Sequence, residues 1–211
     1  MWYPDRLPDW FTAWFKLYTW HSDRDKKLVY LTFDDGPTPL VTDYVLELLD
    51  TYDFKATFFC IGDCVQRHSD IYKRIISRGH GIGNHTMHHL NRWKTKEAIY
   101  LDNVAQASEW IESKLFRPPY GKILPGTAKK LIDNSYKIVM WDVISGDFDT
   151  KRSATSCLNN LKKNTRNGSI IIFHDSNKAH EKLQGILPEY FEFLKKEGFF
   201  SEKIKHTAVI K

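Results

Sequence analysis

The sequence predicts an α/β protein in which parallel strands form a distorted (β/α)7 barrel-like sheet with helices on its outside. Apolar runs alternate with amphipathic segments along most of the chain, which is typical of repeated β/α units. The runs are nearly continuously apolar, as expected of strands that are buried on both faces. Because the 211 residues contain no linker, repeat or low-complexity tract, we expect a single domain.

The predicted strands are short apolar runs. The first, at residues 28–33, reads LVYLTF and ends at the two carboxylates of Asp34 and Asp35. KATFFCI at residues 55–61 is a second buried strand, and GHGIGN at residues 79–84 is a shorter third. Further strands are expected at residues 115–117, 136–142, 168–173 and 203–210.

The predicted helices show apolar residues on one face. Val41, Tyr44, Val45, Leu48 and Leu49 recur at i, i+3, i+4, i+7 and i+8, which predicts an amphipathic helix directly after the first strand. Stripes of the same kind predict helices at residues 71–76 and 101–115, and others are expected at residues 127–134, 154–165 and 189–197.

Composition and charge describe a globular protein without a nucleic-acid partner. Hydrophobic residues make up 42% of the chain and charged residues 27%, and the net charge of +5 comes from scattered Lys and Arg. The three cysteines, Cys60, Cys64 and Cys157, form no regular framework. They are therefore expected to be buried thiols in a reducing compartment.

Residues 1–26 are expected to form an aromatic N-terminal arm ahead of the main domain at residues 27–211. The arm either packs on the domain, where its Trp and Phe cover apolar surface, or dips these aromatic side chains into a membrane surface. It has neither the pattern of a secretion signal nor the roughly 20 apolar residues of a membrane span. The expected location is cytoplasmic or membrane-peripheral, and a monomer is assumed.

Polar residues gather where the predicted strands end. In a barrel of this kind, the carboxyl ends of the strands line the functional site. Residues at these ends are Asp34 and Asp35, His85 to His89, Arg117 to Gly121, Asp142 to Asp149, and His174 with Asp175. Solvation alone does not explain this concentration.

The stretch NHTMHH indicates a metal site. His85 and His89 are four residues apart, which places both imidazoles on one side of a helical turn or tight loop. Two His and one carboxylate leave positions open for water and substrate, and Asp34 or Asp35 can supply the carboxylate. His88 leaves a second pairing open, because His85 and His88 at i, i+3 could also chelate.

Four motifs in order, TFDDGP, NHTMHH, RPPYG and IFHDS, resemble those of the polysaccharide deacetylase family, the NodB-homology domain of carbohydrate esterase family 4. The resemblance runs from about residue 27 to residue 206. It implies a NodB-type fold and a metal-dependent carbohydrate N-deacetylase, a hydrolase of linear amides. The first motif also gives Asp34 and Asp35 two separate functions.

The resemblance assigns the metal and the base. Asp35, His85 and His89 would bind one divalent metal ion, most commonly zinc, although cobalt, nickel or manganese would also suit these ligands. Asp34 would be the general base, and Arg117 would hold it in place. Arg117 and the metal would both favour the ionised form of Asp34.

The resemblance also assigns the acid and the substrate pocket. His174 would be the general acid, because its pKa lies near neutrality and the departing amine needs a proton. The backbone N–H of Tyr120 would help to bind the oxyanion, and Ile172 would line the pocket for the acetyl methyl group. The side chains of Trp141 and Phe148 would complete the substrate-binding wall.

One motif departs from the family pattern of Asp, two residues, Asp, then Trp or Tyr. In WDVISGDFD, Asp147 fits the second acid, and it is expected to pair with His174 and raise its pKa. Ile144 stands where the first acid is usual, while Asp142 and Asp149 lie out of register. The outer part of the sugar site is therefore expected to differ from the family pattern.

These residues favour hydrolysis of the N-acetyl amide of a GlcNAc-type amino sugar, in peptidoglycan or in a chitin-like oligosaccharide. The metal and an N–H donor would polarise the amide carbonyl. Two alternatives remain open: a deformylase or deacylase of a lipid-linked amino sugar, and an inactive carbohydrate-binding module on the same fold. The second would be favoured by loss of a ligand, base or acid, and none is lost.

Overall fold

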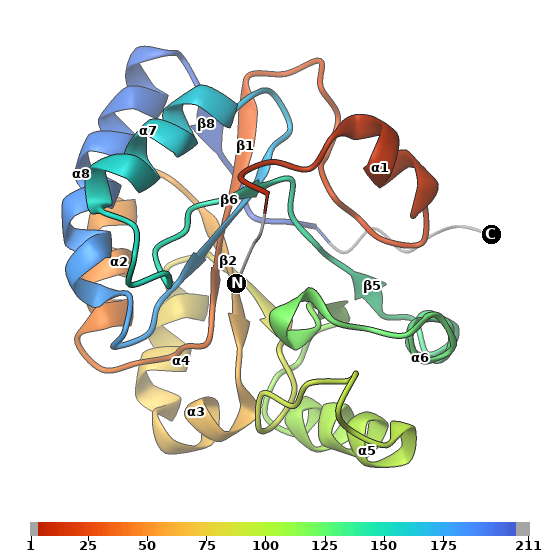
Figure 1. Cartoon of the computed structure of the whole chain (residues 1–211). Helices are drawn as coiled ribbons and strands as arrows, with labels where there is room; N and C mark the ends of the chain where they lie inside the picture. Colours follow the sequence, from red (N-terminus) through yellow and green to blue (C-terminus); the bar gives the residue numbers. More distant parts are fainter. Residues whose placement is uncertain (1–3, 206–211) are drawn as a thin grey trace.

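The computed structural model describes residues 4–205 and confirms the predicted fold class. A parallel sheet in the order β5-β4-β3-β2-β1-β7-β6 curls into a half-barrel with helices around it (Figure 1). The strands are β1 (Leu28–Asp34), β2 (Ala56–Cys60), β3 (Gly81–Asn84), β4 (Leu115–Phe116), β5 (Lys137–Ile138), β6 (Val143–Ile144), β7 (Ile170–His174) and β8 (Phe200–Ser201), which pairs with β1.

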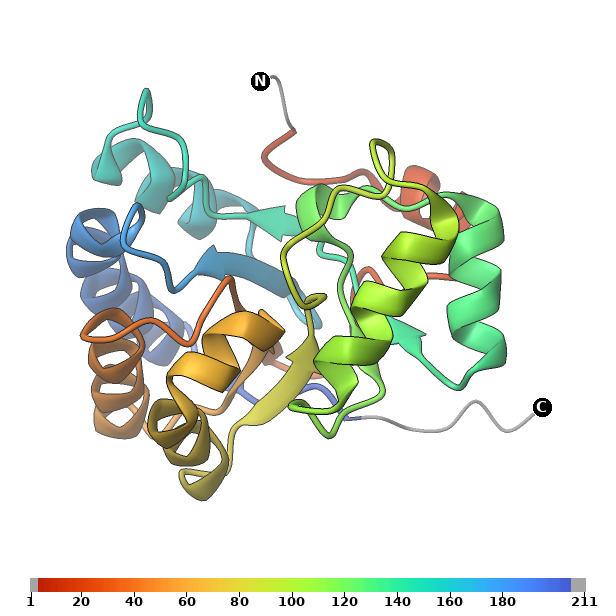
Figure 2. The same cartoon turned by 90° about the horizontal axis from the view of Figure 1, so that it is seen from below.

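The helices follow the strands along the chain and cover the sheet from outside, as Figure 2 shows from the end at which the strands terminate. They are α1 (Asp9–Trp14), α2 (Val41–Thr51), α3 (Gly62–Arg67), α4 (Ser69–Ser77), α5 (Glu97–Ser108), α6 (Pro125–Asp133), α7 (Ala154–Asn164) and α8 (His180–Lys196), with a 3-10 turn η1 (Pro119–Gly121). Because all paired strands are parallel, the sheet has one end at which the strands begin and another at which they finish.

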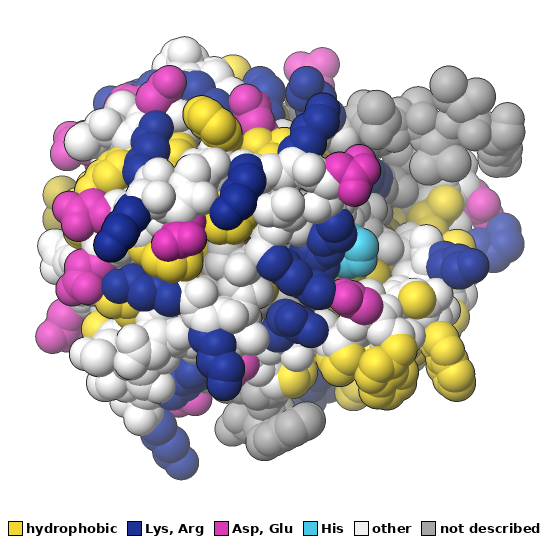
Figure 3. Space-filling view, turned by 90° about the horizontal axis from the view of Figure 1, so that it is seen from above, with side chains coloured by type: hydrophobic (Ala, Val, Ile, Leu, Met, Phe, Trp, Pro, Cys, Tyr) yellow, Lys and Arg dark blue, Asp and Glu magenta, His cyan; other side chains and the backbone are white. Residues whose placement is uncertain are grey.

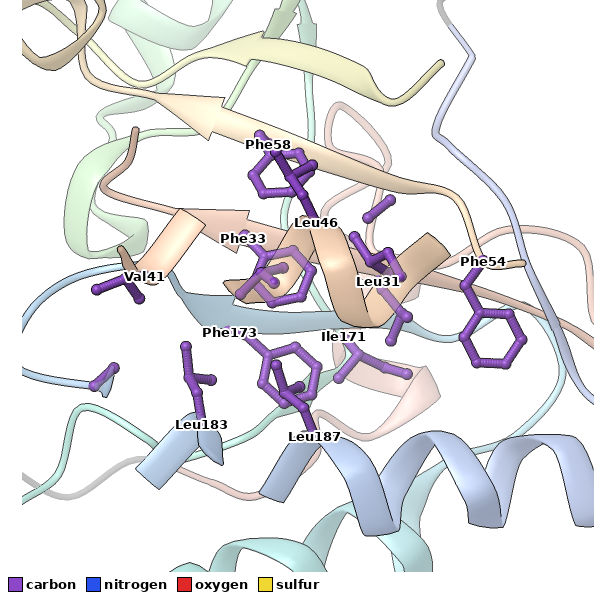
Figure 4. Close-up of a cluster of buried hydrophobic side chains, with 14 of the residues drawn as sticks. Leu31, Phe33, Val41, Leu46, Phe54, Phe58, Ile171, Phe173, Leu183 and Leu187 are labelled. Atoms are coloured by element: carbon purple, nitrogen blue, oxygen red, sulfur yellow. The ribbon is translucent and has the colours of Figure 1, made fainter. Parts of the chain in front are cut away.

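The central strand β1 separates the apolar core from the site. Leu31 and Phe33 point to the outer face, where the ring of Phe33 stacks on Phe58 and Phe173 at centroid distances of 5.2 and 5.4 Å (Figure 4). Because side chains alternate along a strand, Thr32 and Asp34 point to the opposite, inner face. The packing of the core thus fixes the direction of the Asp34 carboxylate.

The predicted strand at 136–142 is wrong in its extent, because this stretch divides between two edges of the sheet. Val139 N–H donates to Phe116 O at 2.8 Å on the β4 side, whereas Asp142 N–H donates to Ile170 O at 3.1 Å on the β7 side. A single extended segment therefore leads from β5 directly to β6. Within the described residues, no helix lies between these two strands, and the segment connects the two edges of the sheet.

Three further boundaries differ from the prediction. The last strand lies at Phe200–Ser201 rather than at 203–210; residues 203–205 are not a strand, and residues 206–210 lie outside the described part of the chain. The helix expected at 101–115 ends at Ser108, because Leu115 is needed in β4.

The final helix begins nine residues earlier than expected, at His180 rather than at 189, and it contains Pro188. The buried stripe of Leu183, Ile186, Leu187 and Tyr190 continues through this proline, so packing against the sheet outweighs the lost backbone hydrogen bond. Helix α3 was not predicted.

The arm lies along the outer edge of the segment between β5 and β6. Thr19 N–H donates to Ile138 O at 2.8 Å, and Leu7 N–H donates to Asp142 O at 3.1 Å. Trp20 is 8% exposed and packs in the second core cluster. The domain boundary at residues 26 and 27 stays a prediction. Within residues 4–205, no helix has the length and apolar character needed to cross a bilayer.

Gly36 lies just beyond the paired ends of β1 and β7, where Asp34 is opposite His174. Its N–H donates to Asp175 Oδ1 at 3.1 Å, and Thr42 Oγ1 donates to Asp175 Oδ2 at 2.5 Å. A Cβ atom on residue 36 would lie 2.0 Å from Asp175 Oδ2. The carboxylate thus occupies the space of a side chain, which explains the glycine after the two aspartates.

Gly36→Ala is expected to lower the free energy of unfolding by about 1–3 kcal/mol, the usual cost of overpacking a buried site. Urea denaturation measures this change. Gly126→Ala on α6 is the matched control, because its Cβ would meet only Glu97 Oε1 at 3.9 Å. If Gly36→Ala were as stable as the control, the close approach of Asp175 would not be a packing constraint.

Candidate active site

Asp34, at the end of β1, is held by a buried ion pair. Arg117 Nη1 donates to Asp34 Oδ1 at 2.6 Å, and the two residues are 0% and 2% exposed. The same nitrogen donates to Thr32 Oγ1 at 2.7 Å. One carboxylate oxygen of Asp34 is therefore fixed against Arg117, and the other faces the metal-ligand candidates.

The guanidinium of Arg117 also holds the segment between β5 and β6. Nε donates to Val139 O at 3.2 Å, and Nη2 donates to Met140 O at 2.9 Å. The group lies over the ring of Phe59, with its carbon 4.1 Å from the ring centroid. Arg117 thus connects β1, β2 and the segment that closes the half-barrel, and it does not line the pocket itself.

The protonation of Asp34 depends on opposing effects. Burial raises the pKa of Asp34, while Arg117 and His174 lower it, and the balance is a pKa of about 6. The expectation that Arg117 favours the ionised form of Asp34 is right in direction, but the effect of burial on the pKa is larger. A group with this pKa is a carboxylate above about pH 6 and can accept a proton near neutrality.

Asp35, His85 and His89 come together as a set of candidate metal ligands. Their ligand atoms lie within 4.8 Å of one another. Asp35 Oδ1 lies 3.3 Å from His89 Nε2 and 3.7 Å from His85 Nε2. Both Asp35, at φ 82°, and His89, at φ 53°, have left-handed backbone conformations, which are uncommon without glycine and are often found at functional sites.

The hydrogen bonds of the histidines indicate which nitrogen can bind a metal. His85 Nδ1 lies 2.7 Å from Arg117 O, and a carbonyl can only accept, so Nδ1 carries the proton and Nε2 has the free lone pair. Burial lowers the pKa of His85 well below its usual value and also lowers that of His89. Both rings are therefore held in the neutral form that binds metals.

His88 points away from this set. Asn103 Nδ2 donates to His88 Nδ1 at 2.8 Å, and the amide N–H of His88 donates to Asn103 Oδ1 at 3.0 Å. Of the two pairings left open by the sequence, only His85 with His89 converges on a carboxylate among the described residues. The hydrogen bonds of His88 to Asn103 on α5 therefore favour the pair of His85 and His89 over the i, i+3 pair.

His174, at the end of β7, pairs with Asp147 as expected. Its Nδ1 donates to Asp147 Oδ1 at 2.8 Å, and its backbone N–H donates to Asp147 Oδ2 at 2.7 Å. Burial opposes protonation, but Asp147, with smaller effects of Asp35 and Asp34, outweighs it and raises the pKa of His174 to about 9. The ring of Phe148 packs edge-on at 5.1 Å. Nε2 of a protonated ring is left free to donate.

Tyr120 contributes in a way that the sequence did not indicate. Its backbone is left-handed, at φ 61°, and its N–H has no acceptor among the described residues. Its side-chain hydroxyl lies 3.1 Å from His89 Nδ1. The hydroxyl can therefore orient His89, while the N–H stays available to an oxygen atom in the pocket.

These groups surround one pocket of about 300 Å³. Its predicted lining residues are Asp34, Asp35, His85, His89, Tyr120, Trp141, Phe148, Ile172 and His174, and Ile144, Gly121, Ser176 and Lys178 complete it. Ser176 and Lys178 were missed. They closely follow His174 at the end of β7, so the expectation that residues at strand ends line the site could have included them. Gly121 has no side chain because a Cβ would lie 2.6 Å from the Trp141 ring.

The comparisons with known proteins identify the family of this chain. A sequence model of the polysaccharide deacetylase family matches residues 21–139. A peptidoglycan-N-acetylglucosamine deacetylase of Bacillus cereus (strain ATCC 14579) is 35% identical over 86% of this chain and 88% of that protein. A chitooligosaccharide deacetylase of Bradyrhizobium sp. (strain ANU 289) is 33% identical over 70% of each chain.

Solved structures show the same relationship. The crystal structure of a peptidoglycan N-acetylglucosamine deacetylase in complex with 4-naphthalen-1-yl-N-oxidanyl-benzamide aligns with a TM-score of 0.85 and 33% identity, over 92% of this chain and 94% of that chain. The chain therefore belongs to the polysaccharide deacetylase family, carbohydrate esterase family 4, a family of generally metal-dependent hydrolases. It spans only 62% of a second Bacillus cereus relative and 41% of the deacetylase PgdA of Listeria monocytogenes.

His89→Ala is expected to bind less than one zinc ion per chain, because it removes a ligand candidate. His88→Ala is the matched control, and it should keep full metal content because His88 contacts Asn103 instead. Metal analysis after equilibrium dialysis measures both variants. A metal-poor His88→Ala beside a metal-replete His89→Ala would reverse the assignment.

Asp147→Asn is expected to lower the pKa of His174 well below about 9 in the metal-free protein. The sign follows because the substitution removes the anion that stabilises the imidazolium, while the burial that opposes protonation remains. An NMR titration of the His174 ring measures the shift. Asp133→Asn on the exposed side of α6 should leave the titration unchanged. An unaltered pKa in Asp147→Asn would contradict the pairing.

Proposed function

We propose that this protein hydrolyses the N-acetyl group of an amino sugar in a glycan such as peptidoglycan or a chitin-like oligosaccharide. The observation that carries the proposal is the arrangement of one base candidate and one acid candidate around a single pocket. Asp34 lines this pocket from the end of β1, and His174 lines it from the end of β7. Asp35, which follows β1, and His85 and His89, which follow β3, line it as well. The named relatives in this family act on such glycans according to their names.

The three ligand candidates suit a divalent metal ion. Two neutral imidazole nitrogens and one carboxylate are a common set for zinc, and they would also accept cobalt, nickel or manganese. A metal ion bound there would polarise the amide carbonyl and make a water molecule easier to deprotonate. We take zinc as the first choice for the native ion.

The protein's own residues would carry the proton transfers. Asp34 would accept a proton from the attacking water, and the Tyr120 N–H would donate to the carbonyl oxygen as negative charge develops on it. His174 Nε2 would donate a proton to the amine nitrogen as the carbon–nitrogen bond breaks. Ile172 and Trp141 would contact the acetyl methyl group.

The pKa values of Asp34 and His174 suit these opposite functions. Asp34, with a pKa of about 6, is ionised above that pH, and His174, with a pKa of about 9, is protonated below that pH. Between the two values the base is a carboxylate and the acid is an imidazolium. Environments that separate the pKa values of two groups in this way are typical of an acid–base pair.

Two alternatives, a deformylase or deacylase of a lipid-linked amino sugar and an inactive carbohydrate-binding module, are less well supported than N-deacetylation. The fold alone does not exclude an inactive module, since a mutant of a CE4 family pseudoenzyme has the same fold, with a TM-score of 0.77 at 24% identity. In this chain, however, all candidate ligands, the base and the acid are present around the pocket. No contact in the described residues favours a formyl group or a lipid-linked sugar over an acetyl group on a glycan.

Activity on defined glycans tests the proposal directly. Zinc-loaded protein should release acetate from N-acetylglucosamine oligosaccharides or from peptidoglycan fragments, and a formamido sugar serves as the comparison substrate. Faster release of formate would favour the deformylase alternative. Binding of these glycans without release of any acid would favour the inactive module.

Asp34→Asn and Asp35→Asn should fail in different ways. Asp34→Asn removes the base but no metal-ligand candidate, so turnover should fall by roughly 10²- to 10⁴-fold while metal stays bound. Asp35→Asn replaces an anionic ligand by a neutral one, so metal affinity should fall and excess metal should restore part of the activity. Turnover and metal content across a metal titration distinguish the two. A metal-poor, rescuable Asp34→Asn would reverse the two functions.

A further inference from the structure

The arm carries a concentrated group of exposed apolar side chains, which we call the aromatic patch. It consists of Trp10, Trp14, Phe15 and Leu17, which are 68%, 83%, 41% and 60% exposed. Trp10 and Trp14 are one turn apart on α1 and therefore lie on the same side of this helix. Soluble proteins rarely leave several large apolar side chains together in water unless the surface binds a partner.

The other side of the arm is already used for packing. Trp20 is buried, and its ring packs against that of Phe11 at a centroid distance of 6.0 Å. The arm is also hydrogen-bonded to the segment between β5 and β6, for example from Thr19 to Ile138. The aromatic patch is thus the remaining face of an anchored element, and its exposure is not the result of a loose end.

Lysine side chains occur within the arm and beside it. Lys16 lies between Phe15 and Leu17 in the sequence, and a groove of about 360 Å³ is lined by Thr19 and His21 of the arm, by Lys137, Lys203 and Lys205, and by one acid, Glu202. Among the described residues, Lys16, Lys203 and Lys205 form no ion pair with an acid. Figure 3 shows many Lys and Arg side chains on this end, with hydrophobic side chains gathered at its lower right, where α1 lies.

The groove lies at the end of the barrel opposite to the candidate active site, and α1, which carries Trp10 and Trp14, lies toward the same end (Figure 1). Leu28, Lys137 and Ile170, which line the groove, are the first residues of β1, β5 and β7. Asp34 and His174, which line the pocket, are the last residues of β1 and β7. A large partner on the aromatic patch would therefore leave the pocket open.

We propose that the aromatic patch and the neighbouring lysines dock this protein on the surface of an anionic lipid bilayer, with the pocket facing away from it. Tryptophan prefers the headgroup region of a bilayer, and unpaired lysines attract anionic lipid. A second copy of the chain fits less well, because a symmetric contact through the patch would bring the Lys16 side chains of both copies into one apolar interface. This proposal does not depend on the reaction catalysed in the pocket.

Sedimentation with lipid vesicles tests the proposal. The wild-type protein should bind vesicles of phosphatidylcholine with about one third phosphatidylglycerol more tightly than vesicles of phosphatidylcholine alone, and salt should weaken the binding. Trp10→Ala/Trp14→Ala should reduce binding by at least about tenfold, since two interfacial anchors are lost. Trp93→Ala is the matched control, because Trp93 is 62% exposed but lies in the loop after β3.

A charge-reversal variant and an assembly measurement complete the test. Lys203→Glu/Lys205→Glu should weaken binding to the anionic vesicles and leave any binding to neutral vesicles unchanged. Circular dichroism checks that each variant is folded, and Trp14→Ser replaces the double variant if that one is not. Equal binding by wild type and the patch variants, or no binding by wild type, would overturn the proposal. A wild-type dimer that becomes a monomer in Trp10→Ala/Trp14→Ala would overturn it in favour of self-association.

Discussion

The position of the Arg117 guanidinium is the constraint on which the candidate site depends. It is a fully buried cation that bonds to Asp34 on β1 and to the carbonyl groups of Val139 and Met140. The backbone carbonyl of Arg117 accepts the hydrogen bond that fixes the ring of His85. Removing one partner of a buried pair typically costs about 3–5 kcal/mol, because the other charge is left unpaired. The base candidate Asp34, the metal-ligand candidate His85 and the closure of the half-barrel are therefore all held in place by Arg117.

The two adjacent aspartates after β1 are tolerated because their surroundings differ. Asp34 is buried against Arg117, whereas Asp35 is partly exposed and turns, with a left-handed backbone, toward His85 and His89. Across the pocket, Asp147 stabilises the charged form of His174. Three aspartates are thus candidates for three different functions: Asp34 as a proton acceptor, Asp35 as a metal ligand and Asp147 as the partner of the acid. The environment of each carboxylate decides which function it can have.

The strand ends could be predicted from the sequence because apolar runs and the residues that follow them are local features. The rule that residues at the carboxyl ends of parallel strands line the functional site placed Asp34, His85 and His174 at one end of the sheet. The division of residues 136–142 between two sheet edges could not be predicted, because it depends on hydrogen bonds to Phe116 and Ile170 far along the chain. The link from His88 to Asn103 was hidden for the same reason.

The turnover of Arg117→Lys, measured as acetate release at saturating metal on folded protein, tests the central claim most directly. Lysine keeps the positive charge but cannot reproduce the planar set of hydrogen bonds to Asp34, Thr32 and the two carbonyl groups. If Arg117 positions the base through this geometry, turnover should fall by about 10²-fold or more. Turnover equal to that of the wild-type protein would show that a buried charge alone is sufficient and would contradict the account.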